Sequence, residues 1–186
     1  MPGSMPGSSG ADASPVINRE MMFFQNNMMY QHGILRVNYT TYDVRRAQDT
    51  INPRTNHCDI MLLSTTGRNP TAHPYRYARV LGIYHVNLIY NEPTVQRYQV
   101  RRMEFLWVRY FELIHNVPVK RGWSIARLDE LQFHPIDHSG AFGFVDPGQV
   151  LRGCHIIPRF FSGECSTGVI SFVQKPPDWG RYYANR

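Results

Sequence analysis

The stretch that decides the fold is MEFLWVRYF, residues 103–111, in which aromatic and apolar side chains surround two charged ones. Residues 142–158 form a second such stretch and contain the runs FGFV and VLRGCHII. Aromatic and β-branched residues favour the pleated surface of a β-sheet. Similar short runs, separated by Gly, Pro and Asn clusters, recur along the chain, and no long amphipathic helix is evident. The sequence therefore predicts a mainly β protein, a small barrel of antiparallel strands with long loops and little helix.

The longest predicted strand is Tyr75–Tyr90, and Gly82 inside it indicates a bulge or a sharp bend. Residues 22–29 begin either a short helix or a strand, and residues 125–133 form either a short strand or a turn of helix. The remaining predicted strands are short or of moderate length: 34–42, 59–63, 98–111, 150–157 and 169–173.

The segment 34–42 has a clear alternation along its length. Its two faces differ in polarity, with Val37 and Tyr39 on one and Asn38 and Thr40 on the other. The segment 43–52 that follows is polar and precedes Pro53, which disfavours helix in the residue before it. We therefore expect residues 43–52 to form a loop or bridging segment.

The length of 186 residues fits one domain with a tail. Residues 1–19 begin with a repeated Met-Pro-Gly-Ser unit and contain few apolar side chains, so we expect a disordered leader there. We expect a β-barrel interaction domain at 20–175 and a C-terminal tail at 176–186. No apolar run approaches the ~18 residues of a membrane helix, so a membrane partner is not expected.

The formal net charge of +6 favours polyanionic partners such as nucleic acid or a nucleosome surface. Of the 20 basic residues, only Lys120 and Lys175 are lysines. Arginine grips phosphate or carboxylate at two points, so its excess has a functional interpretation; GC-rich coding DNA would produce the same excess without one. The candidate nucleic-acid ligands are Arg45, Arg46, Arg54, Arg101, Arg102, Arg121 and Arg127. The alternative is a solvated face neutralised by neighbouring carboxylates, namely Asp43, Asp49, Glu104, Asp129 and Glu130.

A cage for a cationic side chain needs several aromatic rings that converge on one point. The candidates are Tyr77, Trp107, Tyr110, Trp123 and Phe142. The alternative is that these rings form the core of the barrel and its rim, because aromatic residues in strands mostly pack. Of the five, Tyr110 and Trp123 are the residues we most expect to be exposed.

The sequence holds no catalytic or metal-binding motif of the common kinds. His57, Cys58, Cys154, His155 and Cys165 could ligate zinc, but neither Cys-x-x-Cys nor His-x-x-x-His spacing is present. Cys154 could pair with His134 or His138, yet Gly-x-Ser-x-Gly and phosphate-loop motifs are missing. We therefore expect neither catalysis nor a metal or cofactor. The odd number of cysteines, without a short pairing pattern, indicates a reducing compartment, the cytosol or the nucleus.

Several motifs together carry a resemblance to a known family. They are VNYTTYDVRRAQD at 37–49, INPRT at 51–55, FLWVR at 105–109 and RGCH at 152–155. Across residues 26–185 the chain resembles the C-terminal region of large open reading frames associated with DNA transposons in mushroom-forming fungi. Those frames usually carry a long transposase-like region upstream. The resemblance implies a transposon origin and a possible contact with a transposase region.

A second, shorter resemblance covers residues 75–161. The run ARVLGIY at 78–84 is followed by VRYF at 108–111, by LDELQF at 128–133 and by a strand that contains GCHI. This order is similar to that of a bromo-adjacent homology domain, with Tyr110 in place of the usual tryptophan. The resemblance implies a non-catalytic, chromatin-associated module that binds chromatin protein or nucleic acid. The alternative is a structural accessory domain that docks on its own transposase and has no external ligand.

Overall fold

The computed structural model describes residues 22–41, 43, 45–64, 73–90, 99–114, 128–165 and 178–185. This part of the chain is mainly β-strand, as the sequence predicts, with two short 3-10 helices at Pro147–Gln149 and Phe160–Ser162. None of the helices found there could span a membrane. The first six strands are β1 (Met22–His32), β2 (Leu35–Thr40), β3 (Arg46–Ile51), β4 (Asp59–Leu63), β5 (Tyr75–Tyr90) and β6 (Gln99–Leu113). The last five are β7 (Asp129–Phe133), β8 (Phe142–Val145), β9 (Val150–Gly153), β10 (His155–Pro158) and β11 (Tyr182–Asn185).

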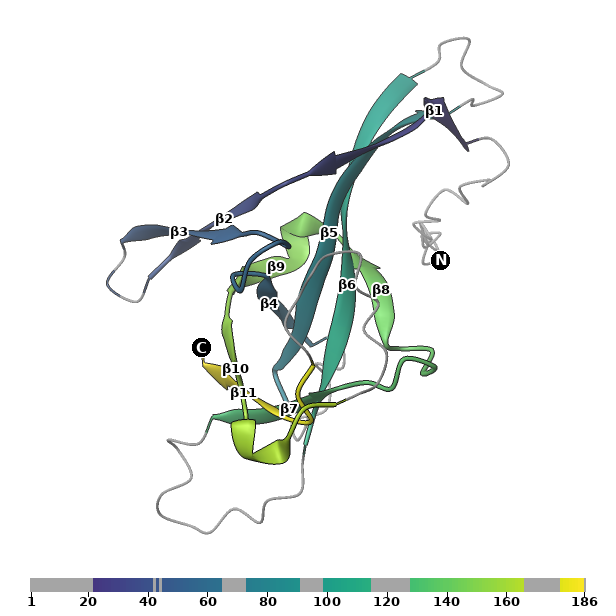
Figure 1. The fold of residues 1–186 in the computed structure, drawn as a ribbon. Helices are drawn as coiled ribbons and strands as arrows, with labels where there is room; N and C mark the ends of the chain where they lie inside the picture. The colour runs from purple at the N-terminus through teal and green to yellow at the C-terminus, as the bar shows by residue number, and fades with distance from the viewer. Residues whose placement is uncertain are drawn as a thin grey trace, which may run out of the picture.

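The strands form one large antiparallel sheet and one small one. In the large sheet the order is β10-β11-β7-β6-β5-β4-β9, while β1 pairs with β5 and β8 pairs with β6. The small sheet contains β2 and β3 (Figure 1). Residues 22–29 and 125–133, for which the sequence left helix and strand open, contribute the strands β1 and β7.

The strand predicted at 150–157 bends sharply in its middle. Cys154 alone separates β9 from β10, and these two strands lie at opposite ends of the sheet order (Figure 1). The Cys154 amide donates to the Asp59 carbonyl at 3.0 Å, so the bend itself is held against β4. The chain therefore joins the two ends of the large sheet directly.

The pair β5–β6 is the central support of the molecule, and it carries the predicted bulge. The register of this pair shifts between Val80 and Gly82, as the glycine indicates. Beyond the bulge, residues 84–90 and 99–105 continue as a long extension to which β1 adds a third strand (Figure 1). We call this extension, residues 22–32, 84–90 and 99–105, the distal arm.

The core lies in two clusters on opposite sides of the central strands. Alternate residues of β4, β5 and β6 supply them, because successive side chains of a strand point to opposite faces. The first cluster contains Ile60, Ala78 and Val108, and also the base of the small sheet through Val37 and Ile51. The second cluster contains neighbours of these residues in β4 and β5, Met61 and Tyr77, together with Phe111 of β6. It also includes Leu131 of β7, Ile156 of β10, and Tyr182 and Ala184 of β11.

Residues 43–52, predicted to be a loop, instead contain the strand β3. β3 pairs with β2 over its whole length, from Leu35 opposite Ile51 to Thr40 opposite Arg46. The prediction was wrong because polar content was taken as a sign of a loop. A strand in a two-stranded sheet needs only one apolar face, and Ile51 anchors that face in the core.

The predicted tail at 176–186 also needs correction. Tyr182–Asn185 form β11, which pairs with β10 on one side and with β7 on the other. Tyr182 is fully buried, so these residues belong to the sheet and not to a tail. The leader at 1–19 and the strand predicted at 169–173 lie outside the described residues.

Candidate functional site

The small sheet is a two-stranded ribbon with one fully exposed face. Exposure alternates along both strands, so that each exposed residue of β2 lies opposite an exposed residue of β3. The resulting outward face has three cross-strand pairs: Arg36–Thr50, Asn38–Gln48 and Thr40–Arg46. Sequence reasoning placed Asn38 and Thr40 on one face correctly. It missed Gln48 and Thr50 because β3 was read as a loop, although Ala47, Asp49 and Ile51 alternate with polar residues there.

The inward face attaches the ribbon to the large sheet. The Gly153 amide of β9 donates to Asp49 Oδ2 at 2.9 Å, and the Arg152 guanidinium lies 4.8 Å from the centre of the Tyr39 ring. Val37 and Ile51 are buried beside these contacts. The inward face of the ribbon is therefore held against the large sheet at Asp49 and Tyr39, and the ribbon extends to one side of the body of the molecule (Figure 1).

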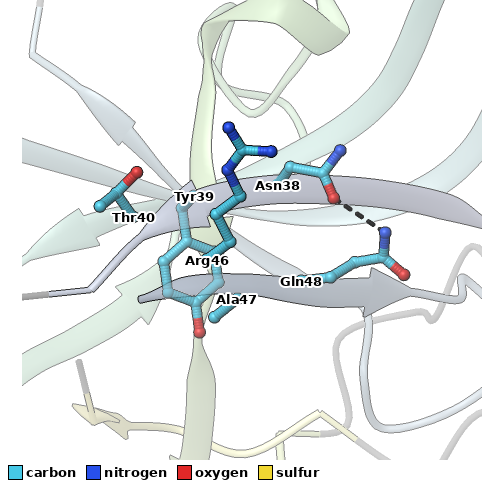
Figure 2. Close-up of a pocket in the computed structure, with 6 residues that line it drawn as sticks. All are labelled: Asn38, Tyr39, Thr40, Arg46, Ala47 and Gln48. Carbon is cyan, nitrogen blue, oxygen red and sulfur yellow. Dashed lines mark hydrogen bonds between the residues drawn. The ribbon is translucent and has the colours of Figure 1, made fainter. Parts of the chain in front are cut away.

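The projecting end of the ribbon forms an open hollow of about 480 Å³. Its walls come from both strands: Asn38, Tyr39, Thr40, Arg46, Ala47 and Gln48. Figure 2 shows the hydrogen bond across the strands, in which Gln48 Nε2 donates to Asn38 Oδ1 at 2.8 Å. In the same view the guanidinium of Arg46 and the hydroxyl of Tyr39 extend in opposite directions.

The arginines near the ribbon differ in how their charge is balanced. Arg45 is paired with Asp43 at 2.9 Å in the exposed turn at the tip. Arg46 and Arg36 have no carboxylate partner within the described part of the chain, and both are exposed. Arg54 is exposed in the turn after β3, where its amide donates to Asn52 Oδ1 at 2.9 Å. Two of the predicted arginines, Arg46 and Arg54, thus accompany Arg36 as cations available around the ribbon.

The other predicted arginines do not join this group. Arg101 and Arg102 lie on the distal arm, opposite Leu88 and Asn87 of β5. Arg102 is paired with Glu104 at 2.8 Å. This ion pair agrees with the alternative interpretation, in which neighbouring carboxylates neutralise the arginines of a solvated face. Arg121 and Arg127 lie outside the described residues.

The predicted aromatic cage is not assembled from the described candidates. Tyr77 is buried in the second cluster, and its hydroxyl donates to Asp129 Oδ2 at 2.6 Å. Tyr110 packs against the first cluster, on the opposite face of the sheet, with the Arg76 guanidinium 4.4 Å from the ring centre. Trp107 instead lies against Phe142, with 6.3 Å between the ring centres. Trp123 lies outside the described residues.

The arginines inside the apolar runs have a structural role. Arg79 binds Asp59 through Nε at 2.8 Å and Nη2 at 3.1 Å, and Arg109 Nη1 lies 2.5 Å from Asp178 Oδ2. The Arg109 guanidinium also lies 4.0 Å from the centre of the Phe133 ring, a cation–π contact. Burial opposes the charge of Arg79, but the attraction of Asp59 outweighs it and raises the pKa of Arg79. The two ion pairs thus compensate the guanidinium charges of Arg79 and Arg109 beside the second core cluster.

The cysteines and histidines form neither of the reactive pairs considered from sequence. His134 and His138 stack on each other at 4.7 Å, whereas Cys154 lines a separate polar hollow with His57 and Asp59. Burial, together with the negative charge of Asp59, raises the pKa of the Cys154 thiol. The thiolate needed for nucleophilic attack is therefore disfavoured there. Within the described ranges, no three His, Cys, Asp or Glu side chains gather closely enough to hold a metal ion.

Comparison with known proteins adds no assignment. No protein-family model, curated protein or solved structure matches the chain. The geometry of the ribbon is therefore the basis for a functional proposal.

Proposed function

We propose that this protein is a non-catalytic module that binds duplex DNA through the outward face of the β2–β3 ribbon. The observation that carries the proposal is the set of three exposed cross-strand pairs, which bring together arginine, asparagine, glutamine and threonine. These are the side chains that contact phosphates and base edges in protein–DNA interfaces. Arg36 and Arg46, which have no carboxylate partner among the described residues, and the net charge of +6 favour a polyanion.

The shape of the ribbon selects the kind of nucleic acid. The major groove of B-DNA, about 12 Å wide, admits a two-stranded β-ribbon. The major groove of duplex RNA is deep and narrow, so side chains cannot read it. The contacts of the ribbon with β9, through Asp49 and Tyr39, lie on its inward face, which leaves the exposed outward face free to enter a groove (Figure 1). We therefore favour DNA over duplex RNA.

The test is a titration of a fluorescently labelled duplex with the wild-type protein and two variants, at several salt concentrations. R46A removes an exposed charge from the ribbon, and R101A removes an exposed charge from the distal arm as a matched control. Affinity should fall steeply with salt, and R46A should reduce the slope of log affinity against log salt by about 1. R101A should leave that slope close to the wild-type value. Binding that does not change with salt, or equal slopes for the two variants, would contradict the proposal.

A protein partner is the second candidate function, and the distal arm favours it. Several of its large apolar side chains are exposed: Phe23, Phe24, Met28, Met29, Val100 and Met103. Exposed apolar patches are common at protein interaction sites. The partner that binds these apolar side chains would be a chromatin protein or the protein's own transposase region, as the two resemblances imply. Binding to nucleosomes but not to free DNA would favour this candidate.

The origin and location of the module remain part of the same proposal. The motifs at 37–55 and 105–109 support a transposon origin, and DNA binding would place the protein in the nucleus. We further infer that the large sheet closes as a barrel through the bent strand β9–β10, similar to a bromo-adjacent homology domain. The order of the strands, with β9 and β10 at its two ends, supports this inference.

A further inference from the structure

The Asn38–Gln48 pair lies at the centre of the outward face of the ribbon. Arg36–Thr50 flanks it toward the base of the ribbon, and Thr40–Arg46 flanks it toward the tip. An arginine is therefore present on either side of the two amides. Any duplex held by these two cations would meet the amide pair at the middle of the contact.

The hydrogen bond within the pair leaves a defined set of polar groups free. Gln48 Nε2 donates to Asn38 Oδ1, which uses one hydrogen of the glutamine amide and one lone pair of the asparagine oxygen. Asn38 retains both hydrogens on Nδ2 and the second lone pair on Oδ1. Among the described residues, Gln48 is the hydrogen-bond partner of this side chain. The Asn38 amide thus presents a donor and an acceptor side by side.

This arrangement complements one base in particular. In the major groove, adenine offers the N7 acceptor beside the N6 amino donor, and an asparagine amide can bond to both at once. Guanine offers two acceptors, N7 and O6, at the same positions. Arginine can donate to both, whereas the Asn38 amide oxygen would face an acceptor and remain without a hydrogen bond. The bond from Gln48 fixes the Asn38 amide before DNA arrives, which lowers the entropy lost on binding.

We propose that Asn38 reads an adenine in the major groove of duplex DNA, and that Gln48 is a positioning residue for it. This inference rests on the proposed function, because it requires the ribbon to enter DNA. It adds a base preference to an interaction that phosphate contacts alone would leave independent of sequence.

The test is selection of bound duplexes from a library with a randomised central region. Wild-type protein should enrich adenine at one position or more, and N38A should lose that enrichment while its salt dependence stays unchanged. R46A should show the converse, with a reduced salt dependence and retained adenine enrichment. Q48A should weaken the adenine preference without abolishing general binding.

A chemical substitution in the DNA then isolates the contact. Replacing the enriched adenine by 7-deazaadenine removes the N7 acceptor and should weaken binding of wild type by about 5- to 150-fold, the range for a bidentate base contact. N38A should bind the two duplexes equally. If duplexes bind with steep salt dependence but adenine is not enriched, or if N38A retains the enrichment, the adenine inference is overturned and the proposed function stands. If the library does not bind at all, both are overturned.

Discussion

Arg109 and Asp178 form an ion pair in the interior of the protein, and both residues are almost completely buried. The Nε atom of Arg109 is buried and has no hydrogen-bond partner among the described residues, so Asp178 is the main compensation for this charge there. A buried charge that loses its partner is far more costly than an exposed one. The arginine of the motif VRYF is therefore dependent on a residue that is distant along the sequence.

We expect D178A to lower the free energy of unfolding by about 3–5 kcal/mol, because it leaves the Arg109 charge buried without its carboxylate partner. Urea denaturation of the purified variant measures this loss. The double variant R109M/D178L removes both charges and keeps apolar volume, so it should recover most of the loss. A double variant as unstable as D178A would show that the loss comes from packing around residue 178 and not from the unpaired charge.

At the scale of the element, the bulge in β5 is fitted to one aromatic neighbour. A Cβ atom added to Gly82 would lie only 2.6 Å from Cζ of Tyr84, whose ring stacks on Phe105 at 5.6 Å. Glycine is therefore needed at this position for close packing of the Tyr84 ring over the backbone. The backbone angles of Gly82 do not themselves require glycine, since its φ is not in the left-handed region.

We expect G82A to destabilise the protein by about 1–3 kcal/mol, the usual range for overpacking, because the Tyr84 ring must leave its place against Phe105. In a Y84A background the same substitution should cost little, since the obstructing ring is gone. Unfolding free energies of the wild type, the two single variants and the double variant form a thermodynamic cycle that measures this coupling. An equal loss in both backgrounds would argue for a backbone effect.

The elements also differ in how well local sequence predicts them. The strand Tyr75–Tyr90 and its bulge were predicted, because a long apolar run with one internal glycine is a local signal. The faces of β2 were predicted from simple alternation. β3 and β11 were missed because their residues are polar or follow a proline-rich segment. Their strand conformation depends on partners, β2 for the first and β7 and β10 for the second.

At the scale of the whole molecule, packing is uneven. The part of β5 between Tyr77 and Ile83 is packed into the two core clusters, whereas Leu88–Tyr90 in the distal arm are only half-buried. Local opening is easiest where few apolar contacts must be broken. The arm and the body should therefore open separately although the same strands run through both.

Hydrogen exchange measured by mass spectrometry or NMR tests this difference. Amides at 77–83 should exchange at least about tenfold more slowly than those at 88–90, because opening the body exposes far more apolar surface. The matched comparison is within β6, where the amides of residues 106–111 should exchange more slowly than those of residues 100–104. Equal protection along the whole of β5 would mean that arm and body unfold as one cooperative unit.

The sequence by itself determined the β class, the long central strand with its glycine bulge, and the polar face of β2. Those features depend on side-chain alternation and on the properties of single residues, which are local. Only the tertiary structure decided that Gln48 lies beside Asn38, that 182–185 are a strand, and that Arg109 is neutralised by Asp178. The physical reason is that hydrogen bonds between strands and buried ion pairs join distant residues, 69 positions apart for Arg109 and Asp178, and no local pattern encodes such a partner.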